Sequence, residues 1–131
     1  MPESDAVLEL EGFRIFKCSP EGQPLRDSPD ATELIGAARS QGVTLVVIPE
    51  ERLGDDFFRL KTGIAGEILQ KFIMYDLKVA IVGDISRYTD QSLALRDFVY
   101  ECNEGVRIWF LPDLRSVAER LRSHLGIAGV R

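Results

Sequence analysis

The chain has few of the residues on which most catalytic and metal sites depend. Its 131 residues include one histidine and two cysteines. His124 is the single histidine, so a zinc site built from several histidines is excluded. It lies in the last turn of a predicted helix, where a histidine interacts favourably with the helix dipole. Cys18 and Cys102 each lie within an apolar pattern, which indicates buried thiols in a reducing compartment instead of a disulfide.

Long apolar runs are missing too. No stretch approaches the roughly 20 apolar residues of a membrane span, and residues 1–12 have neither the basic start nor the apolar run of a signal peptide. The formal net charge of -5 gives no attraction for phosphate backbones or anionic lipid. We therefore expect a cytoplasmic protein with no nucleic-acid partner, no membrane contact and no cofactor.

Catalytic motifs are absent in the same way. Lys61, Thr62 and Gly63 spell the K-T-G of penicillin-binding enzymes, but no serine in the chain has a lysine three residues later, as that chemistry requires. A P-loop fails because Leu60, and not glycine, precedes the lysine. No local sequence supports a Ser-His-Asp or Cys-His nucleophile. We therefore assign no catalytic residue and favour a protein that is not an enzyme.

The strongest positive feature is a βαβ unit between Thr44 and Ile85. Two strand-like stretches, at residues 43–48 and 78–82, flank a long amphipathic segment. Parallel strands need a crossover of a dozen or more residues, usually helical, so these two strands are predicted to be parallel and central. Thr62 is the predicted N-cap of the crossover helix. The apolar stripe of that helix consists of Ile64, Ile68, Leu69, Phe72 and Ile73.

The remaining patterns extend this unit to the order ββαβαβαβα. Alternating residues predict an N-terminal β-hairpin that turns at Glu11 and Gly12. The other predicted elements are a helix from Ser28 as N-cap to Gly42, a helix over residues 90–102, a strand over residues 107–111 and a last helix capped by Asp113. We predict a single α/β domain over residues 1–131, with one mixed, mostly parallel sheet, helices packed on it and a frayed tail at residues 126–131.

Part of the chain carries a resemblance. The block RLGDDFFRLKTGIAGEILQKF, followed by KVAIVGDIS, ALRDFVYECNEG and RIWF, resembles the bacterial domain-of-unknown-function family numbered 4180, from Phe13 to Leu121. That resemblance implies no activity.

More remotely, the element order resembles the STAS domain, the fold of bacterial anti-sigma-factor antagonists, and its lipid-binding SpoIIAA-like relatives. In the antagonists a strand ends in Asp-Ser-Ser-Gly, and a partner kinase phosphorylates the first serine. Lys61, Thr62 and Gly63 hold the corresponding place here, without the aspartate and serine pair. The resemblance therefore implies Thr62 as a candidate phosphosite.

Charged residues follow both central strands. Ligands of open α/β sheets bind at the carboxyl ends of the strands, which makes this edge the predicted binding surface. The surface comprises Glu50, Glu51, Asp55, Asp56, Lys61, Thr62, Gly63 and Asp84. The alternative for the carboxylates is solvated loop charge with helix capping by Asp55 or Asp84.

Three functions fit these observations. The first, which we favour, is a regulatory or scaffold domain that binds another protein, or a second copy of itself, through this surface. The second is a binder of a small or lipid-like molecule, with Phe57, Phe58 and Phe72 as a pocket wall. The third is a metal-assisted enzyme whose carboxylates hold a divalent cation or act as an acid and base pair.

Overall fold

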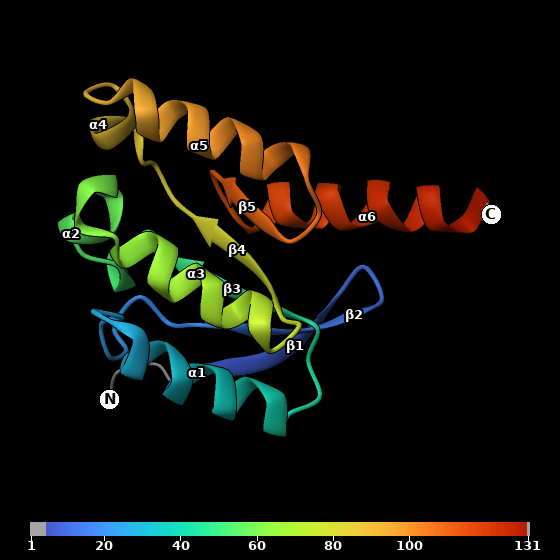
Figure 1. The fold of residues 1–131 in the computed structure, drawn as a ribbon. Coiled ribbons are helices and arrows are strands. Elements are labelled where there is room, and N and C mark those ends of the chain that lie inside the picture. Colours follow the sequence, from blue (N-terminus) through green and yellow to red (C-terminus); the bar gives the residue numbers. More distant parts are fainter. Residues whose placement is uncertain (1–4, 131) are drawn as a thin grey trace.

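The fold, seen in a computed structural model, is built on one mixed sheet with helices on both faces (Figure 1). The structure describes residues 5–130, with side chains as far as Ser123. The strand order is β1-β2-β3-β4-β5, where β1 and β2 are antiparallel and the other pairs are parallel. The predicted fold class, including the order ββαβαβαβα and the parallel central pair, is therefore confirmed, with short extra helical turns between the main elements.

The strands are β1 (Ala6–Leu10), β2 (Phe13–Lys17), β3 (Leu45–Pro49), β4 (Lys78–Val82) and β5 (Ile108–Leu111). The helices are α1 (Ser28–Ser40), α2 (Asp55–Phe58), α3 (Ile64–Met74), α4 (Ser86–Thr89), α5 (Leu93–Glu104) and α6 (Leu114–Val130). Two 3₁₀ turns, η1 (Glu50–Arg52) and η2 (Leu60–Thr62), lie on either side of α2. None of the helices in the described part of the chain has the length and apolarity needed to cross a bilayer.

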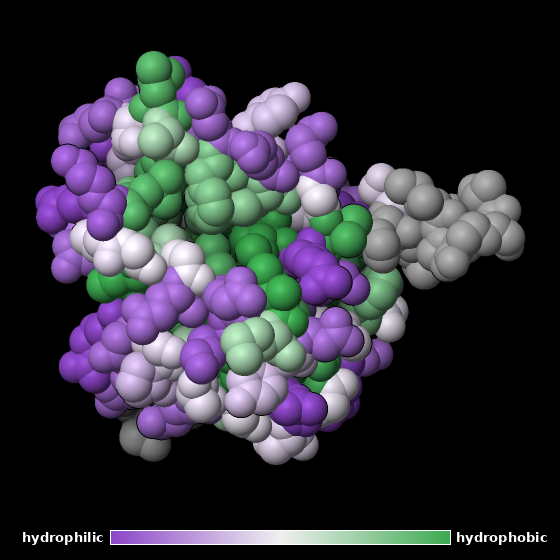
Figure 2. All heavy atoms as spheres, viewed as in Figure 1, coloured by the Kyte–Doolittle hydropathy of each residue, from purple (hydrophilic) through white to green (hydrophobic). Residues whose placement is uncertain are grey.

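One face of the sheet carries α1, α3 and α5. Val46 and Ile48 of β3 point into the apolar cluster that these helices share with the sheet. These helices connect consecutive parallel strands that are neighbours in the sheet. Because such crossovers share the same handedness, the helices lie on the same face. In the view of Figure 1, Figure 2 shows apolar residues gathered in the furrow between α3 and α5.

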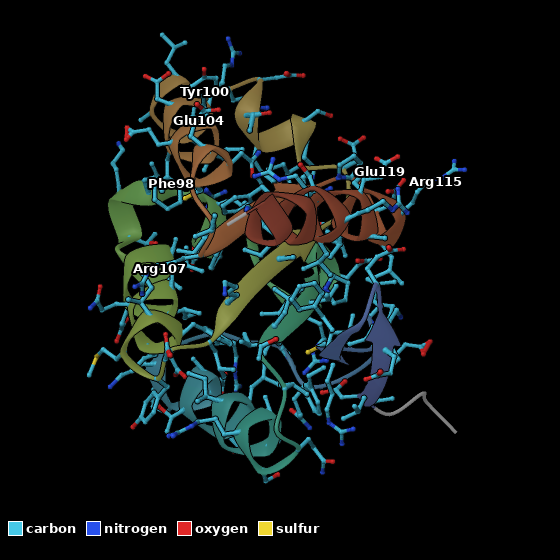
Figure 3. The ribbon with its side chains drawn as sticks, turned by 90° about the vertical axis from the view of Figure 1, so that its right-hand side faces the viewer. Phe98, Tyr100, Glu104, Arg107, Arg115 and Glu119 are labelled. Atoms are coloured by element: carbon cyan, nitrogen blue, oxygen red, sulfur yellow. The ribbon has the colours of Figure 1, made fainter. Side chains whose placement is uncertain are left out.

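The opposite face is covered by α6. Leu45 and Val47 alternate with the residues of the first cluster, so they point the other way, where they pack with Val117 and Leu121. Figure 3 shows Arg115 and Glu119 pointing outward from α6. β3 is therefore buried on both faces, as its continuous run of apolar residues predicts.

Several predicted boundaries are wrong by a few residues, because side-chain hydrogen bonds decide where a helix starts. Asp27, and not Ser28, is the N-cap of α1, since its side chain accepts a hydrogen bond from the Asp30 N–H at 3.1 Å. α5 begins at Leu93 because Ser92 is extended and caps it, while α4 lies inside the predicted loop.

Strand ends shift as well. β3 begins at Leu45 and includes Pro49, which pairs in register with Val82. The predicted Asp113 cap is confirmed by its 2.9 Å bond from the Ser116 N–H. The side chain of His124 and the predicted tail at residues 126–131 lie outside the residues whose side chains are described, although the α6 backbone continues to Val130.

Candidate functional site

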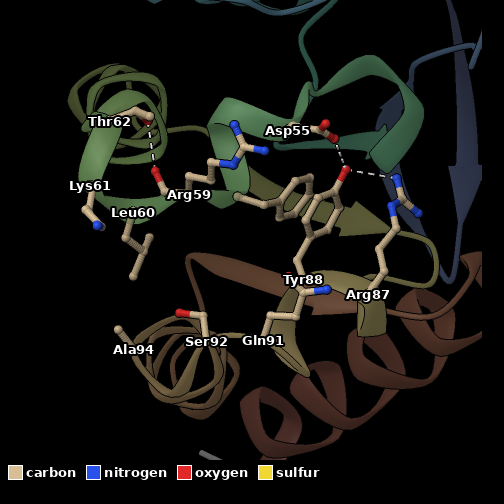
Figure 4. Close-up of a pocket in the computed structure, with 11 residues that line it drawn as sticks. Asp55, Arg59, Leu60, Lys61, Thr62, Arg87, Tyr88, Gln91, Ser92 and Ala94 are labelled. Carbon is tan, nitrogen blue, oxygen red and sulfur yellow. Dashed lines mark hydrogen bonds between the residues drawn. The ribbon is translucent and has the colours of Figure 1, made fainter.

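The candidate site is a cleft at the carboxyl ends of β3 and β4. These strands end side by side, and the chain leaves β3 into η1, α2 and η2 and leaves β4 into α4. Residues 55–62 form one wall of the cleft, and residues 87–94 form the other (Figure 4). We call this space, about 710 Å³ in volume, the strand-end cleft.

Aromatic rings form the inner end of the strand-end cleft. The rings of Phe58 and Tyr88 stack with centroids 4.4 Å apart and planes 9° apart. Phe57, which is buried, supports Phe58 from the side in an edge contact with centroids 5.0 Å apart. Because Phe58 comes from one wall and Tyr88 from the other, the stack joins the two walls.

A hydrogen-bonded chain reinforces this junction. The Tyr88 hydroxyl donates to Oδ1 of Asp55 at 2.6 Å and accepts from Nη2 of Arg87 at 2.9 Å. The same nitrogen of Arg87 lies 3.1 Å from Oε2 of Glu50, and the guanidinium lies 4.5 Å from the centre of the Tyr88 ring. Burial, followed by the bond to Asp55, raises the pKa of Tyr88, so the phenol stays a neutral donor near pH 7.

Gly83 allows Glu50 to enter this network. Its φ of +134° is one that residues with a side chain rarely adopt, and a Cβ there would lie 2.5 Å from Cγ of Glu50. The Glu50 side chain is accordingly only 14% exposed. In the sequence, a glycine directly after an apolar run indicates that the strand stops there. The close approach of the Glu50 side chain to Gly83 is seen only in the structure.

The structure brings together only some of the predicted carboxylates. Glu50 and Asp55 meet through Arg87 and Tyr88, whereas the others stand apart. Glu51 is exposed, Asp56 makes a surface pair with Arg59 at 3.5 Å, and Asp84 accepts the Ser86 N–H at 2.9 Å at the start of α4. Hydrogen bonds from Ser86 lower the pKa of Asp84, but Ile85 is the N-cap of α4 and Gly54 is the N-cap of α2, so neither Asp84 nor Asp55 is the predicted helix cap.

Metal binding finds no support in this arrangement. Within residues 5–123, no three histidine, cysteine, aspartate or glutamate side chains are placed to share an ion. The carboxylates of Glu50 and Asp55 already accept hydrogen bonds from Arg87 and Tyr88. The two carboxylates that meet at the strand ends are therefore engaged with side chains of the opposite wall.

Thr62 lines the strand-end cleft, but its predicted role as the N-cap of α3 is wrong. Gly63, with φ of +77°, holds that position and has no side chain to cap with. The Thr62 hydroxyl lies within donating distance of the carbonyl oxygens of Asp56, at 2.6 Å, and Arg59, at 2.9 Å. It also accepts the Ile64 N–H at 3.2 Å.

This geometry changes what a negative charge at position 62 would do. The threonine hydroxyl supplies a proton to carbonyl oxygens, and neither an ionised aspartate nor a phosphate dianion can do so. Either group would face the carbonyl oxygens of Asp56 and Arg59 at close range. We therefore expect Thr62→Asp to disturb this turn, and modification of Thr62 stays a prediction.

The predicted aromatic pocket wall is partly wrong. Phe58 does line the strand-end cleft, but Phe72 is fully buried on the face of α3 that packs on the sheet, and Phe57 contacts Phe58 from the side. The sequence misses Arg87 and Tyr88, which lie in a segment predicted as loop. Four residues of α4 are too few to show helical periodicity, so no signal in the sequence places them at the cleft.

Comparison with known proteins gives a family and nothing more specific. The family model described as "Domain of unknown function (DUF4180)" matches residues 10–121, which include both walls of the cleft. No curated protein and no solved structure matches the chain. The likeness to STAS domains therefore stays a prediction from element order.

Proposed function

Since the chain belongs to the DUF4180 family, whose description assigns no activity, we propose a function from the geometry of the site. The protein is a non-catalytic domain that binds a small organic molecule in the strand-end cleft. The observation that carries this proposal is a cleft of about 710 Å³ whose lining includes the stacked Phe58 and Tyr88 rings. Small-molecule pockets occupy roughly 300–1,000 Å³ and are lined mainly by apolar and aromatic groups.

The chemistry of the lining supports binding over catalysis. No histidine or cysteine lines the strand-end cleft among the described residues. The raised pKa of Tyr88 keeps its phenol protonated, and its hydroxyl is already bonded to Asp55 and Arg87. Catalytic acids and bases work best with pKa values near the operating pH, and the raised pKa of Tyr88 moves this phenol away from that range.

The walls are also held in place before any ligand arrives. The Asp55–Tyr88 hydrogen bond and the Phe58–Tyr88 stack tie α2 to α4. A cleft whose walls are already fixed spends less binding free energy on ordering side chains. This favours specific recognition of a small, rigid ligand.

Filling the cleft should abolish binding. Ala94 is an exposed, small residue of α5 that lines the outer part of the strand-end cleft, so Ala94→Trp places an indole in the ligand's space. We expect the uncharged fluorophore N-phenyl-1-naphthylamine to bind the wild type saturably and Ala94→Trp at least about tenfold more weakly, a loss of about 1.4 kcal/mol. Fluorescence titration measures both affinities.

The matched control is Ala37→Trp, which adds the same side chain to an exposed site on α1 outside this cleft. It should bind the fluorophore like the wild type. Circular dichroism first confirms that both variants fold. Equal affinity in all three proteins, or no saturable binding by the wild type, would contradict the proposal.

A protein partner is the second candidate, because α5 exposes two large apolar side chains. Leu93 is 71% exposed and Tyr100 is 66% exposed, and their spacing of seven residues puts them on one face of the helix (Figure 3 labels Tyr100). Leu93 lies between two residues that line the cleft, Ser92 and Ala94. A regulatory or scaffold role would use this face together with the mouth of the cleft.

A further inference from the structure

The strand-end cleft has a local charge opposite to that of the whole chain. The protein has a formal net charge of -5. The cleft lining, by contrast, contains the three cations Arg59, Lys61 and Arg87 and one carboxylate, that of Asp55. A positive lining in an acidic protein attracts anions to this place in preference to the rest of the surface.

Two of these cations are free to pair with a ligand. Arg87 is committed to Glu50 and Tyr88, as described above. Arg59 makes only a 3.5 Å contact with Asp56, and both side chains are more than 60% exposed, so this surface pair contributes little. Within the described residues, Lys61 has no ion pair or side-chain hydrogen bond.

The free cations stand beside apolar surface. In Figure 4, Leu60 and Lys61 extend from η2 toward Ser92 and Ala94 on the opposite wall, with the Tyr88 ring farther in. A ligand whose body lies against Leu60 and Tyr88 therefore lies along the wall that carries both free cations, with Lys61 at the far side of the view from Tyr88 and Arg59 between them (Figure 4). The lining combines an apolar body site with a cationic head site.

We propose that the ligand is a small organic acid, with an aromatic or aliphatic body and one carboxylate or similar anionic group. The inference rests on the proposed function and adds the charge class of the ligand. The body packs against Leu60 and the Tyr88 ring, on which the buried Phe58 ring stacks. The anionic group pairs with Arg59 and Lys61, whose charge-assisted hydrogen bonds are stronger than neutral ones.

Two fluorophores that differ by one anionic group test the proposal. 1-Anilinonaphthalene-8-sulfonate has the aromatic body of N-phenyl-1-naphthylamine with a sulfonate added. The double variant Arg59→Gln/Lys61→Gln should bind the sulfonate about tenfold more weakly than the wild type while its affinity for the neutral fluorophore stays the same. Raising the salt concentration from about 0.05 M to about 0.5 M should weaken only the sulfonate's binding to the wild type.

The control variant is Arg107→Gln/Arg115→Gln, which removes the same two charges from exposed positions outside the cleft. It should leave both affinities unchanged. Equal loss of sulfonate binding in the two double variants would mean that overall charge alone attracts the anion, which overturns the inference.

Two further outcomes separate this inference from the proposed function. If the neutral fluorophore binds in the cleft and Arg59→Gln/Lys61→Gln leaves the affinity for the sulfonate unchanged, the ligand's charge class is wrong and the binding function stands. If the wild type binds neither fluorophore saturably, the proposed function fails and the inference fails with it.

Discussion

Replacing Phe72 with alanine should lower the free energy of unfolding by about 3–5 kcal/mol. Among the described residues, Phe72 is the largest side chain that is fully buried. It belongs to the apolar cluster between the sheet and α1, α3 and α5. Truncation loses the favourable transfer of the ring from water and leaves a cavity that the rigid sheet beneath cannot close. Urea denaturation followed by circular dichroism measures the change.

Met74→Ala is the matched control for this experiment. Met74 lies on the same helix two residues later but is 61% exposed, so its loss should change stability by less than about 1 kcal/mol. A loss for Phe72→Ala as small as that of Met74→Ala would mean that the ring is not in the core. The assignment of α3 to the inner layer would then be wrong.

Arg52→Met should lower the free energy of unfolding by a similar amount, about 3–5 kcal/mol, as expected when one member of a buried ion pair is removed. The Arg52 side chain is 4% exposed, and its Nη1 lies 2.9 Å from Oδ1 of Asp5 and 2.8 Å from the Ser19 carbonyl oxygen. Its Nε donates to the Gln23 carbonyl oxygen. Methionine fills the space but leaves these acceptors without their donors.

The loop that contains Gly22 packs closely against the Arg52 guanidinium. A Cβ at Gly22 would lie 2.5 Å from Nη1 of Arg52, so the loop folds directly over the guanidinium. Arg26→Met is the control, because Arg26 pairs with Asp30 on the surface with 70% of its side chain exposed, and its loss should leave the urea midpoint close to that of the wild type. If both variants unfold at the same urea concentration as the wild type, Arg52 does not anchor this loop.

The contrast between Phe72 and Arg52 explains what could be predicted from the sequence. Phe72 belongs to a helical stripe of apolar residues, and such local patterns also locate β4 and β1 at their observed bounds and β2 to within one residue. The partners of Arg52 lie 29 to 47 residues away in the chain, in segments with no regular pattern. Contacts of that kind follow from the completed fold and leave no periodic signal.

In the candidate site, too, one part could be predicted from the sequence and another part could not. That Asp55, Lys61 and Thr62 lie at the carboxyl ends of the central strands follows from βαβ topology. The second wall depends on Tyr88 stacking on Phe58, which is a long-range contact made by a helix of four residues. The sequence therefore predicts the location of the site and one of its walls, but neither the cleft nor its bonded network.

The claim that the strand-end cleft binds a small organic acid is tested most directly by native mass spectrometry of the protein purified from its own cells. The wild type should retain an organic mass that is released on denaturation and identified as an acid, and Ala94→Trp purified in the same way should lack it. The same organic mass on both proteins, or a polypeptide as the only added mass on the wild type, would contradict the claim.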